Sequence, residues 1–221
     1  VFTATPQGFC ASVISEAVLS QTRIIDLSAD FRLKNAQIYE KWYKIEHKAP
    51  QFLSEAVYGL CEIHRQSIKK ARLVANPGCY TTCAILSLYP LIKAGVAELN
   101  SIIIDAKSGK SGAGRNERLD NLFCETNENF AAYGVSTHRH TPEIEEQLSN
   151  VAGREFALQF TPHLVPMQRG ILSTAYVNLS ANLSENEARE IYEDFYKDEA
   201  FVKLLPKGVL PQTRFVRGTN F

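Results

Sequence analysis

The sequence lacks the two short motifs that most often mark a phosphate-binding turn. Neither a G-x-G-x-x-G pattern nor a P-loop pattern occurs in its 221 residues. The phosphate-binding turn of a dinucleotide site is therefore not in this chain.

An excess of charge and long apolar runs are also missing. The 24 Lys and Arg residues balance the 24 Asp and Glu residues, so the formal net charge is zero. A neutral chain gives no reason to expect a nucleic acid or an anionic membrane as partner. The apolar runs are far shorter than the roughly 18 residues that a bilayer crossing needs, and no signal-peptide pattern opens the chain.

The regular cysteine spacing of a disulfide-rich domain is also absent. The five cysteines are an odd number and are scattered along the chain, which favours a reducing, cytoplasmic environment. Cys79 and Cys83 are close in sequence, but a metal site would need at least two further ligands, so no metal site is predicted.

What the sequence does contain is the composition of a globular protein. Hydrophobic residues make up 45% and charged residues 22%, and this length holds one large domain or two small ones. The chain opens with Val1 inside a strand-like segment and stops just after Asn220, so we expect a piece of a longer protein.

Strand and helix patterns alternate along the chain. Strands are expected at 1–5, 24–27, 72–75, 101–107, 155–162 and 170–179. Helices are expected at 9–19, 37–43, 79–93, 141–150 and 184–196, with Thr141 and Ser184 as N-caps and a kink or early end at Pro90. Residues 50–60 read as irregular. The pattern predicts an α/β first part and an α+β second part with a mixed or antiparallel sheet, hence two domains, the first of them incomplete.

The segment Asn76-Pro77-Gly78-Cys79 joins a strand pattern to a helix pattern. A cysteine at a helix N-terminus lies where backbone N–H groups and the helix dipole favour negative charge, and the thiolate is the reactive form. Cys79 is thus a candidate nucleophile. The alternative is an ordinary buried small hydrophobe.

Three further segments hold candidate ligand groups. Residues 5–8 (TPQG) and 25–30 (IDLSAD) end strands, where α/β sheets bind ligands, although they can equally be ordinary turns. Residues 108–115 (SGKSGAGR) can form an anion nest from backbone N–H groups, or a mobile surface loop.

Two histidines and an arginine are concentrated in His138-Arg139-His140, which Glu143 follows. Histidine is the natural base near neutral pH, a carboxylate can orient it, and arginine suits a carboxylate or phosphate. The alternative is a solvated loop before a helix. Farther on, Arg169 is a plausible anion contact, whereas His163 is expected to be structural.

A nucleophilic cysteine, a basic histidine and several arginines together indicate acyl transfer on an anionic substrate. Two classes stay open on these residues alone. One is a cysteine hydrolase, and the other is a dehydrogenase that passes through a thioester.

Taken together, the segments resemble the N-acetyl-γ-glutamyl-phosphate reductase family of the semialdehyde dehydrogenase superfamily. The matching segments are TPQG (5–8), IIDLSADFRL (24–33), VYGL (57–60), NPGCY (76–80), SGKSGAGR (108–115), HRHTPEI (138–144), HLVPMQRGI (163–171) and VRGTN (216–220). Their number and order make the resemblance specific. Two departures are Thr81 and Cys61, which stand where the family usually has proline.

The resemblance implies a fold and a division of the chain. Residues 1–78 would be part of a Rossmann-type NADP-binding domain, residues 79–215 a catalytic and oligomerisation domain, and residues 216–221 the start of the return to the first domain. The catalytic domain would resemble that of semialdehyde and glyceraldehyde-phosphate dehydrogenases. The family leads us to expect a homo-oligomer, a dimer or a tetramer.

The resemblance also implies a reaction: reversible, NADPH-dependent reduction of N-acetyl-γ-glutamyl phosphate to N-acetylglutamate 5-semialdehyde and phosphate, in arginine biosynthesis. The nucleophile would be Cys79, forming a thioester, and the base His140, oriented by Glu143, with His138 as second choice. The substrate-binding residues would be His138, Arg139, Arg169 and Asn76. The cofactor-binding residues would be Thr5, Pro6, Gln7, Gly8, Ser28, Ser108, Gly109, Ser111, Gly112 and Asn220.

Other functions stay open beside this one. The α-aminoadipyl-phosphate reductase of lysine biosynthesis shares the chemistry and differs in substrate length. A cysteine hydrolase or a non-catalytic binding homologue would belong to different classes.

Overall fold

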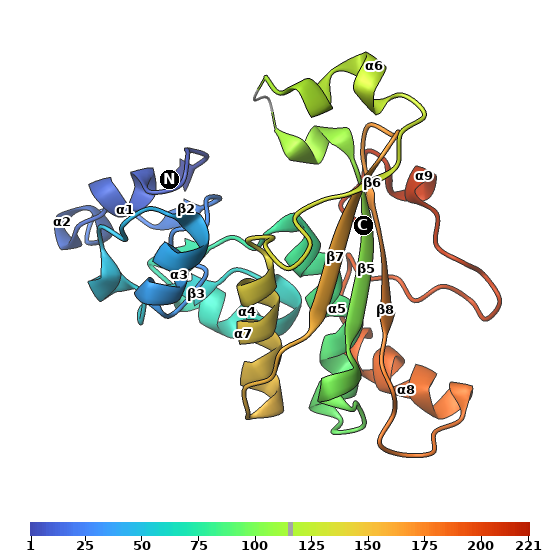
Figure 1. Cartoon of the computed structure of the whole chain (residues 1–221). Coiled ribbons are helices and arrows are strands. Elements are labelled where there is room, and N and C mark those ends of the chain that lie inside the picture. Colours follow the sequence, from blue (N-terminus) through green and yellow to red (C-terminus); the bar gives the residue numbers. More distant parts are fainter. Residues whose placement is uncertain (115–116) are drawn as a thin grey trace. The chain divides into compact units, whose positions relative to one another are not determined.

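A computed structural model describes residues 1–114 and 117–221 of the chain. They form two compact units, Val1–Thr82 and Cys83–Phe221. The two units are described in turn (Figure 1).

The first unit is built on a parallel sheet with strand order β1-β2-β4-β3. The strands are β1 (Phe2–Thr3), β2 (Ile24–Asp26), β3 (Val57–Tyr58) and β4 (Leu73–Ala75). All three pairings between neighbours are parallel. The carboxyl ends of these strands therefore meet at one edge of the sheet, where α/β domains bind ligands.

The helices of the first unit connect these strands. They are α1 (Phe9–Val13), α2 (Glu16–Leu19), α3 (Ala36–Tyr43), the 3₁₀ turn η1 (Pro50–Phe52) and α4 (Cys61–Lys70). The expected single helix at 9–19 is wrong, because the Ser15 side chain accepts a hydrogen bond from the Val18 amide and starts a second helix. The segment 50–60, which was expected to be irregular, contains β3, and residues Cys61–Lys70, for which no helix was expected, form α4.

The core of the first unit lies between its sheet and its helices. It is a cluster of buried residues that includes Cys10, Leu19, Ile24, Phe31, Phe52 and Leu73. Burial raises the pKa of the Cys10 thiol to about 12, so this cysteine is a packed, unreactive group.

The second unit contains a mixed sheet with strand order β6-β7-β5-β8, so the expected mixed sheet is confirmed. The strands are β5 (Ile103–Gly109), β6 (Ala131–Ala132), β7 (Gln159–Val165) and β8 (Ile171–Tyr176). The central strand β5 pairs in parallel with β7 and antiparallel with β8. Its residues Ile104, Ala106 and Ser108 are buried on one face.

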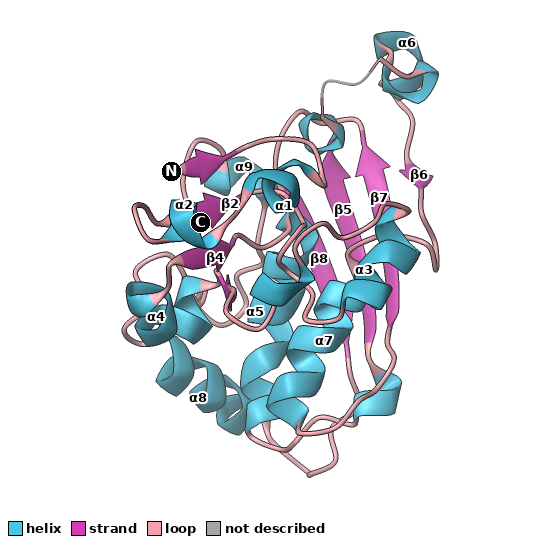
Figure 2. Cartoon of the chain, turned by 90° about the vertical axis from the view of Figure 1, so that its left-hand side faces the viewer, coloured by secondary structure: helices cyan, strands magenta, loops and turns pink. Residues whose placement is uncertain are grey.

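The helices of the second unit lie mainly beside this sheet (Figures 1 and 2). They are α5 (Cys79–Lys93, which begins in the first unit), η2 (Leu99–Ser101), η3 (Lys110–Ala113), η4 (Leu119–Asn121), α6 (Phe123–Thr126), α7 (Thr141–Ala152), α8 (Glu185–Tyr196) and α9 (Thr213–Val216). Ser184 caps α8 with a reciprocal bond from Glu187, as expected. Within the described residues, no helix combines the length and the hydropathy that a bilayer crossing requires.

Helix α5 continues past Pro90 to Lys93, so the proline does not end the helix. Proline has no N–H to donate to the carbonyl four residues earlier, which is that of Leu86. The hydroxyl of Tyr196 in α8 donates to this carbonyl instead, at 2.6 Å. A side chain from another helix thus replaces the missing helical hydrogen bond.

We expect Tyr196→Phe to lower the free energy of unfolding by about 1 kcal/mol, because it leaves the Leu86 carbonyl unpaired. In a Pro90→Ala background the alanine amide can reach that carbonyl, and the same substitution should cost less. Urea unfolding of the four proteins of this double-mutant cycle measures the difference. Equal costs in both backgrounds would contradict the replacement of one bond by the other. Tyr192→Phe, one turn away on α8, is the matched control, because the Ser87 carbonyl that Tyr192 contacts keeps its helical donor.

Candidate active site

The nucleophile turn, residues 76–79, connects β4 to α5. Cys79 is the first residue of α5, as predicted, and its side chain is exposed. The Asn76 amide donates to the Asp26 carbonyl at 2.8 Å, which continues the pairing of β4 with β2 up to the turn. The thiol therefore projects from the carboxyl edge of the parallel sheet, at a helix N-terminus.

Arg32 holds the nucleophile turn from one side. It is 8% exposed, its Nε donates to the Asn76 carbonyl at 2.7 Å, and its Nη2 donates to the Leu27 carbonyl at 2.9 Å. Hydrogen bonds from a charged donor are stronger than neutral ones. Arg32 thus links the end of β2 to the turn that carries the nucleophile. The sequence displays this arginine in the DFRL segment but gives no sign of its role.

Hydrogen bonds to the Gly78 carbonyl restrain the same turn. It accepts hydrogen bonds from the Thr82 amide at 3.0 Å, from the Thr81 hydroxyl at 2.6 Å and from the Thr82 hydroxyl at 2.9 Å. Thr81 is the third residue of α5, so its own N–H needs no helical acceptor, and a proline or a threonine fits there equally. In this chain the threonine adds a hydrogen bond that proline could not make.

Buried carboxylates organise the carboxyl ends of β1 and β2. Asp30 accepts from the Gly8 amide at 2.7 Å, from the Ala11 amide at 3.0 Å and from the Tyr39 hydroxyl at 2.7 Å. The Ser28 hydroxyl donates to Asp26 at 2.7 Å and is itself buried. Gly8 and Ser28 are both predicted to meet a cofactor. The Gly8 amide and the Ser28 hydroxyl, however, already donate hydrogen bonds to carboxylates of the same unit.

Thr5, Pro6 and Gln7 are the other predicted cofactor residues at this edge. Pro6 and Gln7 are exposed. The Thr5 hydroxyl is buried and finds no hydrogen-bond partner among the described residues. A buried polar atom without a partner fits a site that a polar ligand completes.

The histidine cluster, residues 138–143, precedes and opens α7 in the second unit. The structure corrects the expected N-cap, since α7 starts at Thr141 and His140 occupies the cap position. The His140 carbonyl accepts the Ile144 amide at 3.0 Å as the first helical bond. Glu143 lies in the first turn and is 1% exposed, whereas Arg139 is exposed.

His138 is enclosed by aromatic rings. The ring centroids of Tyr133, Phe160 and His140 lie 5.4, 5.4 and 4.8 Å from that of His138. Its Nδ1 accepts the His140 amide at 3.1 Å, which requires the neutral ring with its proton on Nε2. Burial, followed by the charges of His140 and Arg139, lowers the pKa of His138 to about 3.

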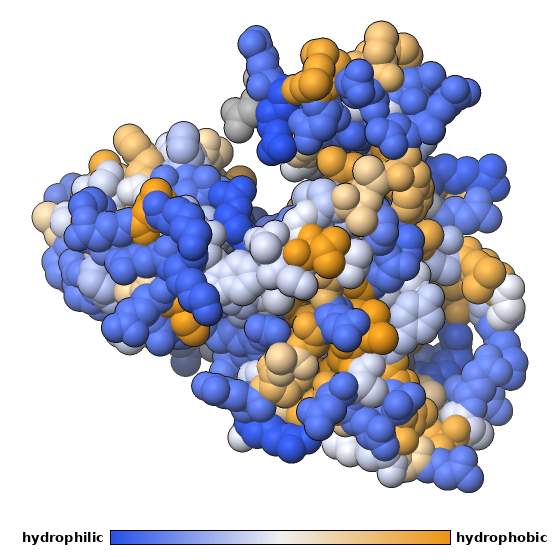
Figure 3. Space-filling model, viewed as in Figure 1, coloured by the Kyte–Doolittle hydropathy of each residue, from blue (hydrophilic) through white to orange (hydrophobic). Residues whose placement is uncertain are grey.

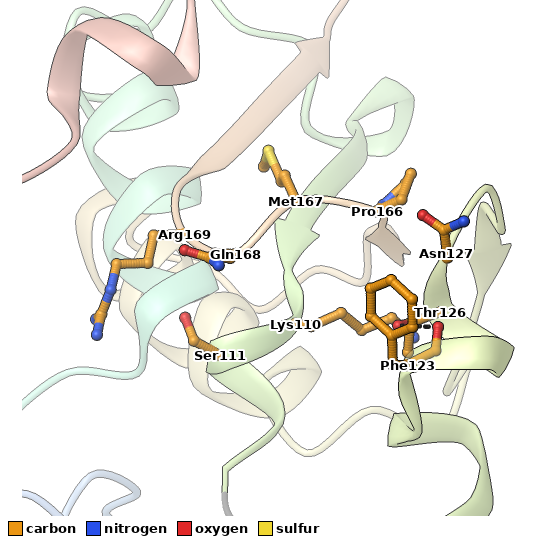
Figure 4. A pocket seen from close by; sticks show the side chains of 9 residues that line it. All are labelled: Lys110, Ser111, Phe123, Thr126, Asn127, Pro166, Met167, Gln168 and Arg169. Atoms are coloured by element: carbon orange, nitrogen blue, oxygen red, sulfur yellow. Dashed lines mark hydrogen bonds between the residues drawn. The ribbon is translucent and has the colours of Figure 1, made fainter.

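A pocket of about 360 Å³ opens beside the strand ends of the second unit (Figure 4). Its lining is Lys110, Ser111, Phe123, Thr126, Asn127, Pro166, Met167, Gln168 and Arg169. Two of the predicted residues, Ser111 and Arg169, thus come together there with a second cation, Lys110. Phe123 belongs to a segment with apolar side chains on its surface (Figure 3) and is 78% exposed. No sequence pattern indicated the aromatic and amide side chains of the lining.

The expected anion nest in the glycine-rich segment is wrong for residues 109–111. Their amides already donate to the carbonyls of Gly170, Met167 and Gln168, at 3.0, 2.9 and 3.1 Å. Gly109 permits this pairing, because a Cβ there would lie 2.7 Å from the Gln168 and Arg169 backbone. The amides of this segment, which joins the end of β5 to η3, are thus paired with the 167–170 loop and are not available to bind an anion.

The remaining predicted residues are placed as follows. Ser108 is buried and its hydroxyl donates to the Gly109 carbonyl at 3.1 Å. Gly112 and Asn220 are exposed in the second unit. Arg115, the end of the glycine-rich segment, lies outside the described residues. His163 contacts Asp105, with Nδ1 3.1 Å from Oδ1.

Two family models match the chain. Residues 1–71 match the semialdehyde dehydrogenase NAD binding domain, and residues 79–221 match the semialdehyde dehydrogenase dimerisation domain. The chain belongs to the semialdehyde dehydrogenase family. Among solved structures it is similar to aspartate semialdehyde dehydrogenase II from Vibrio cholerae, with a TM-score of 0.68, 14% identity and coverage of 98% of this chain and 64% of that one.

Curated relatives are similar over the whole chain. The N-acetyl-gamma-glutamyl-phosphate reductase of Lachnoclostridium phytofermentans is 63% identical over 100% of this chain and 64% of its own length. The protein of the same name from Campylobacter jejuni subsp. doylei is 60% identical over 100% of this chain and 65% of its own length. The chain thus spans slightly less than two thirds of these relatives.

The pKa of His138 predicts an acid-side loss of stability. The folded pKa of about 3 lies below the ordinary value of 6.5, so the unfolded chain binds an extra proton between these values. The stability from the neutral ring is therefore complete above about pH 6.5 and is lost as the pH falls toward 3. Urea unfolding between these pH values should show a loss that is smaller in His138→Gln. His163→Gln, which keeps His138, should retain it, and the same pH slope in His138→Gln and the unsubstituted protein would contradict the assignment.

Proposed function

We propose that the protein is an NADP-dependent reductase of N-acetyl-γ-glutamyl phosphate, which forms N-acetylglutamate 5-semialdehyde and phosphate in arginine biosynthesis. The observation that carries this proposal is the exposed Cys79 thiol at the start of α5, on a turn restrained by side-chain hydrogen bonds. The relatives named for this reaction, 63% and 60% identical, support the choice of substrate. We further propose a cytoplasmic homo-oligomer with a small-molecule substrate and no nucleic-acid or membrane partner.

In this proposal Cys79 is the nucleophile. The helix N-terminus favours its thiolate, because four amides of the first turn lack helical acceptors and the dipole is positive there. The thiolate sulfur attacks the acyl carbon of the substrate, the bond from that carbon to the phosphate oxygen breaks, and phosphate leaves. The product of this half-reaction is a thioester on Cys79.

His140 is the proposed base and acid, and Glu143 is proposed to orient it. A base must take the thiol proton before attack and return a proton when the aldehyde is released. His138 is a poor choice for this step, since its pKa of about 3 leaves it with little affinity for a proton at neutral pH. We infer that His138 instead orders the loop before α7, by accepting the His140 amide.

The arginines are proposed to bind the substrate anions, with Asn76 and His138 beside the reacting group. Arg169 and Lys110 both belong to the lining of the pocket, and the planar guanidinium of an arginine suits a carboxylate or a phosphate. Arg139 is exposed next to the proposed base. Such anion contacts hold the acyl carbon in position for attack.

A nicotinamide cofactor, when bound, supplies the hydride that reduces the thioester to the level of the aldehyde. Residues 5–7 fit such a group, because the Thr5 hydroxyl is buried without a partner among the described residues and Pro6 and Gln7 are exposed beside it. Ser111 and Gly112 are further proposed cofactor-binding residues. The match of residues 1–71 to an NAD binding domain supports the nicotinamide, and NADP is the specific form we propose.

We expect Cys79→Ser to lower turnover by at least about 10³-fold, because the hydroxyl is a far weaker nucleophile at neutral pH. The assay follows NADPH formation from the semialdehyde, phosphate and NADP with the complete gene product. Cys61→Ser is the matched control, since Cys61 is also an exposed cysteine at the first residue of a helix, and it should keep its activity. Wild-type turnover in Cys79→Ser would refute the nucleophile.

Substrate length separates the proposed reaction from its nearest rival. We expect the five-carbon N-acetylglutamate semialdehyde to be used with a higher kcat/KM than the six-carbon semialdehyde of lysine biosynthesis. A preference for the six-carbon substrate would favour the α-aminoadipyl-phosphate reductase. Hydrolysis without any NADPH signal would point to a cysteine hydrolase, and loss of all turnover in a folded protein to a non-catalytic homologue.

A further inference from the structure

The geometry points to Thr81 as a positioning residue for the Cys79 thiolate, acting through the carbonyl group of Gly78. The inference rests on the role proposed above for Cys79.

A directed chain of hydrogen bonds reaches Gly78 through Thr81. The Thr81 hydroxyl gives its single proton to the Gly78 carbonyl at 2.6 Å, so its oxygen is left to accept from the Tyr58 hydroxyl at 3.3 Å. Thr81 is 0% exposed and Tyr58 is 6% exposed. The chain is therefore shielded from water, where hydrogen bonds are electrostatically stronger.

The same peptide group connects this chain to the nucleophile. The carbonyl of Gly78 and the N–H of Cys79 belong to one peptide unit, so polarising the carbonyl increases the positive charge on that N–H. This N–H is among the first four of α5, which have no acceptor in the helix. Thr81 thus strengthens the positive end of the helix at the residue whose sulfur must carry a negative charge.

Threonine and serine hydroxyls often bond to a carbonyl one turn back, so the bond alone would be unremarkable. Ser87, in the same helix, makes such a bond to the Ala84 carbonyl at 2.9 Å. Thr81 differs in two respects. Its acceptor is the peptide group that precedes the nucleophile, and its oxygen also receives a proton donor from Tyr58 on β3. Ser87 therefore provides the matched control.

The experiment measures the alkylation rate of each cysteine by iodoacetamide between about pH 5 and 10, by mass spectrometry of the cysteine peptides. The proteins are the unsubstituted chain, Thr81→Val, Thr81→Ser, Tyr58→Phe and Ser87→Ala. Cys61, which is exposed, is the reference thiol. Cys10, which is 0% exposed, reports unfolding of the first unit if it becomes reactive.

We expect Thr81→Val to slow alkylation of Cys79 at pH 7 by about three- to tenfold, the usual effect of one hydrogen bond, and to raise the pH midpoint of its reaction. Tyr58→Phe should act in the same direction with a smaller effect. Thr81→Ser, which keeps the hydroxyl, and Ser87→Ala should match the unsubstituted chain. At each pH, the alkylation rate of Cys61 should be the same in all five proteins.

The inference is overturned if Thr81→Val keeps the original Cys79 profile while Cys10 stays protected, or if Thr81→Ser is as slow as Thr81→Val. If Thr81→Val unfolds the first unit and so exposes Cys10, the Tyr58→Phe protein provides the test instead. An unchanged Cys79 profile in Tyr58→Phe would then overturn the inference. Alkylation requires neither cofactor nor substrate. Absence of reductase turnover in the unsubstituted protein would therefore refute the proposed function, while the alkylation rates would still test the role of Thr81.

Discussion

The nucleophile turn is a short backbone segment whose carbonyl groups accept hydrogen bonds from the side chains around it. Arg32 fixes the Asn76 carbonyl, and the hydroxyls and amide of Thr81 and Thr82 fix that of Gly78. A turn restrained in this way can present an exposed thiol at a constant angle while the helix behind it supplies the positive end of a dipole. The proposed chemistry depends on that restraint, since each later step requires the sulfur in one place.

The two histidines of the histidine cluster show how burial separates residues that look alike in sequence. His138 is enclosed by three rings and accepts the His140 amide, and both contacts favour its neutral ring. His140 occupies the cap position of α7 and remains the proposed base. The sequence places the two rings two residues apart, but only the packing of Tyr133 and Phe160 around His138 shows why its pKa is lowered.

Local signals predicted much of the fold. The helix that begins at Cys79, the capped helix at Glu185–Tyr196 and the mixed sheet were all read correctly. The errors have physical causes. Strand β3 is two residues long and is defined by pairing with β4, and α4 is a polar helix with none of its residues buried. The break at Ser15 arises because a serine can cap a new helix within a helical pattern.

The sequence by itself determined the chemical groups: a cysteine after a proline-glycine turn, two histidines and an acid at a helix start, and the order of segments that indicated the family. It did so because turns, caps and helix starts depend on neighbouring residues. The tertiary structure alone decided what supports those groups. Arg32 reaches Asn76 across 44 positions and Tyr58 reaches Thr81 across 23. Such contacts follow from how parallel strands are brought together, which is a property of the sheet and not of any local pattern.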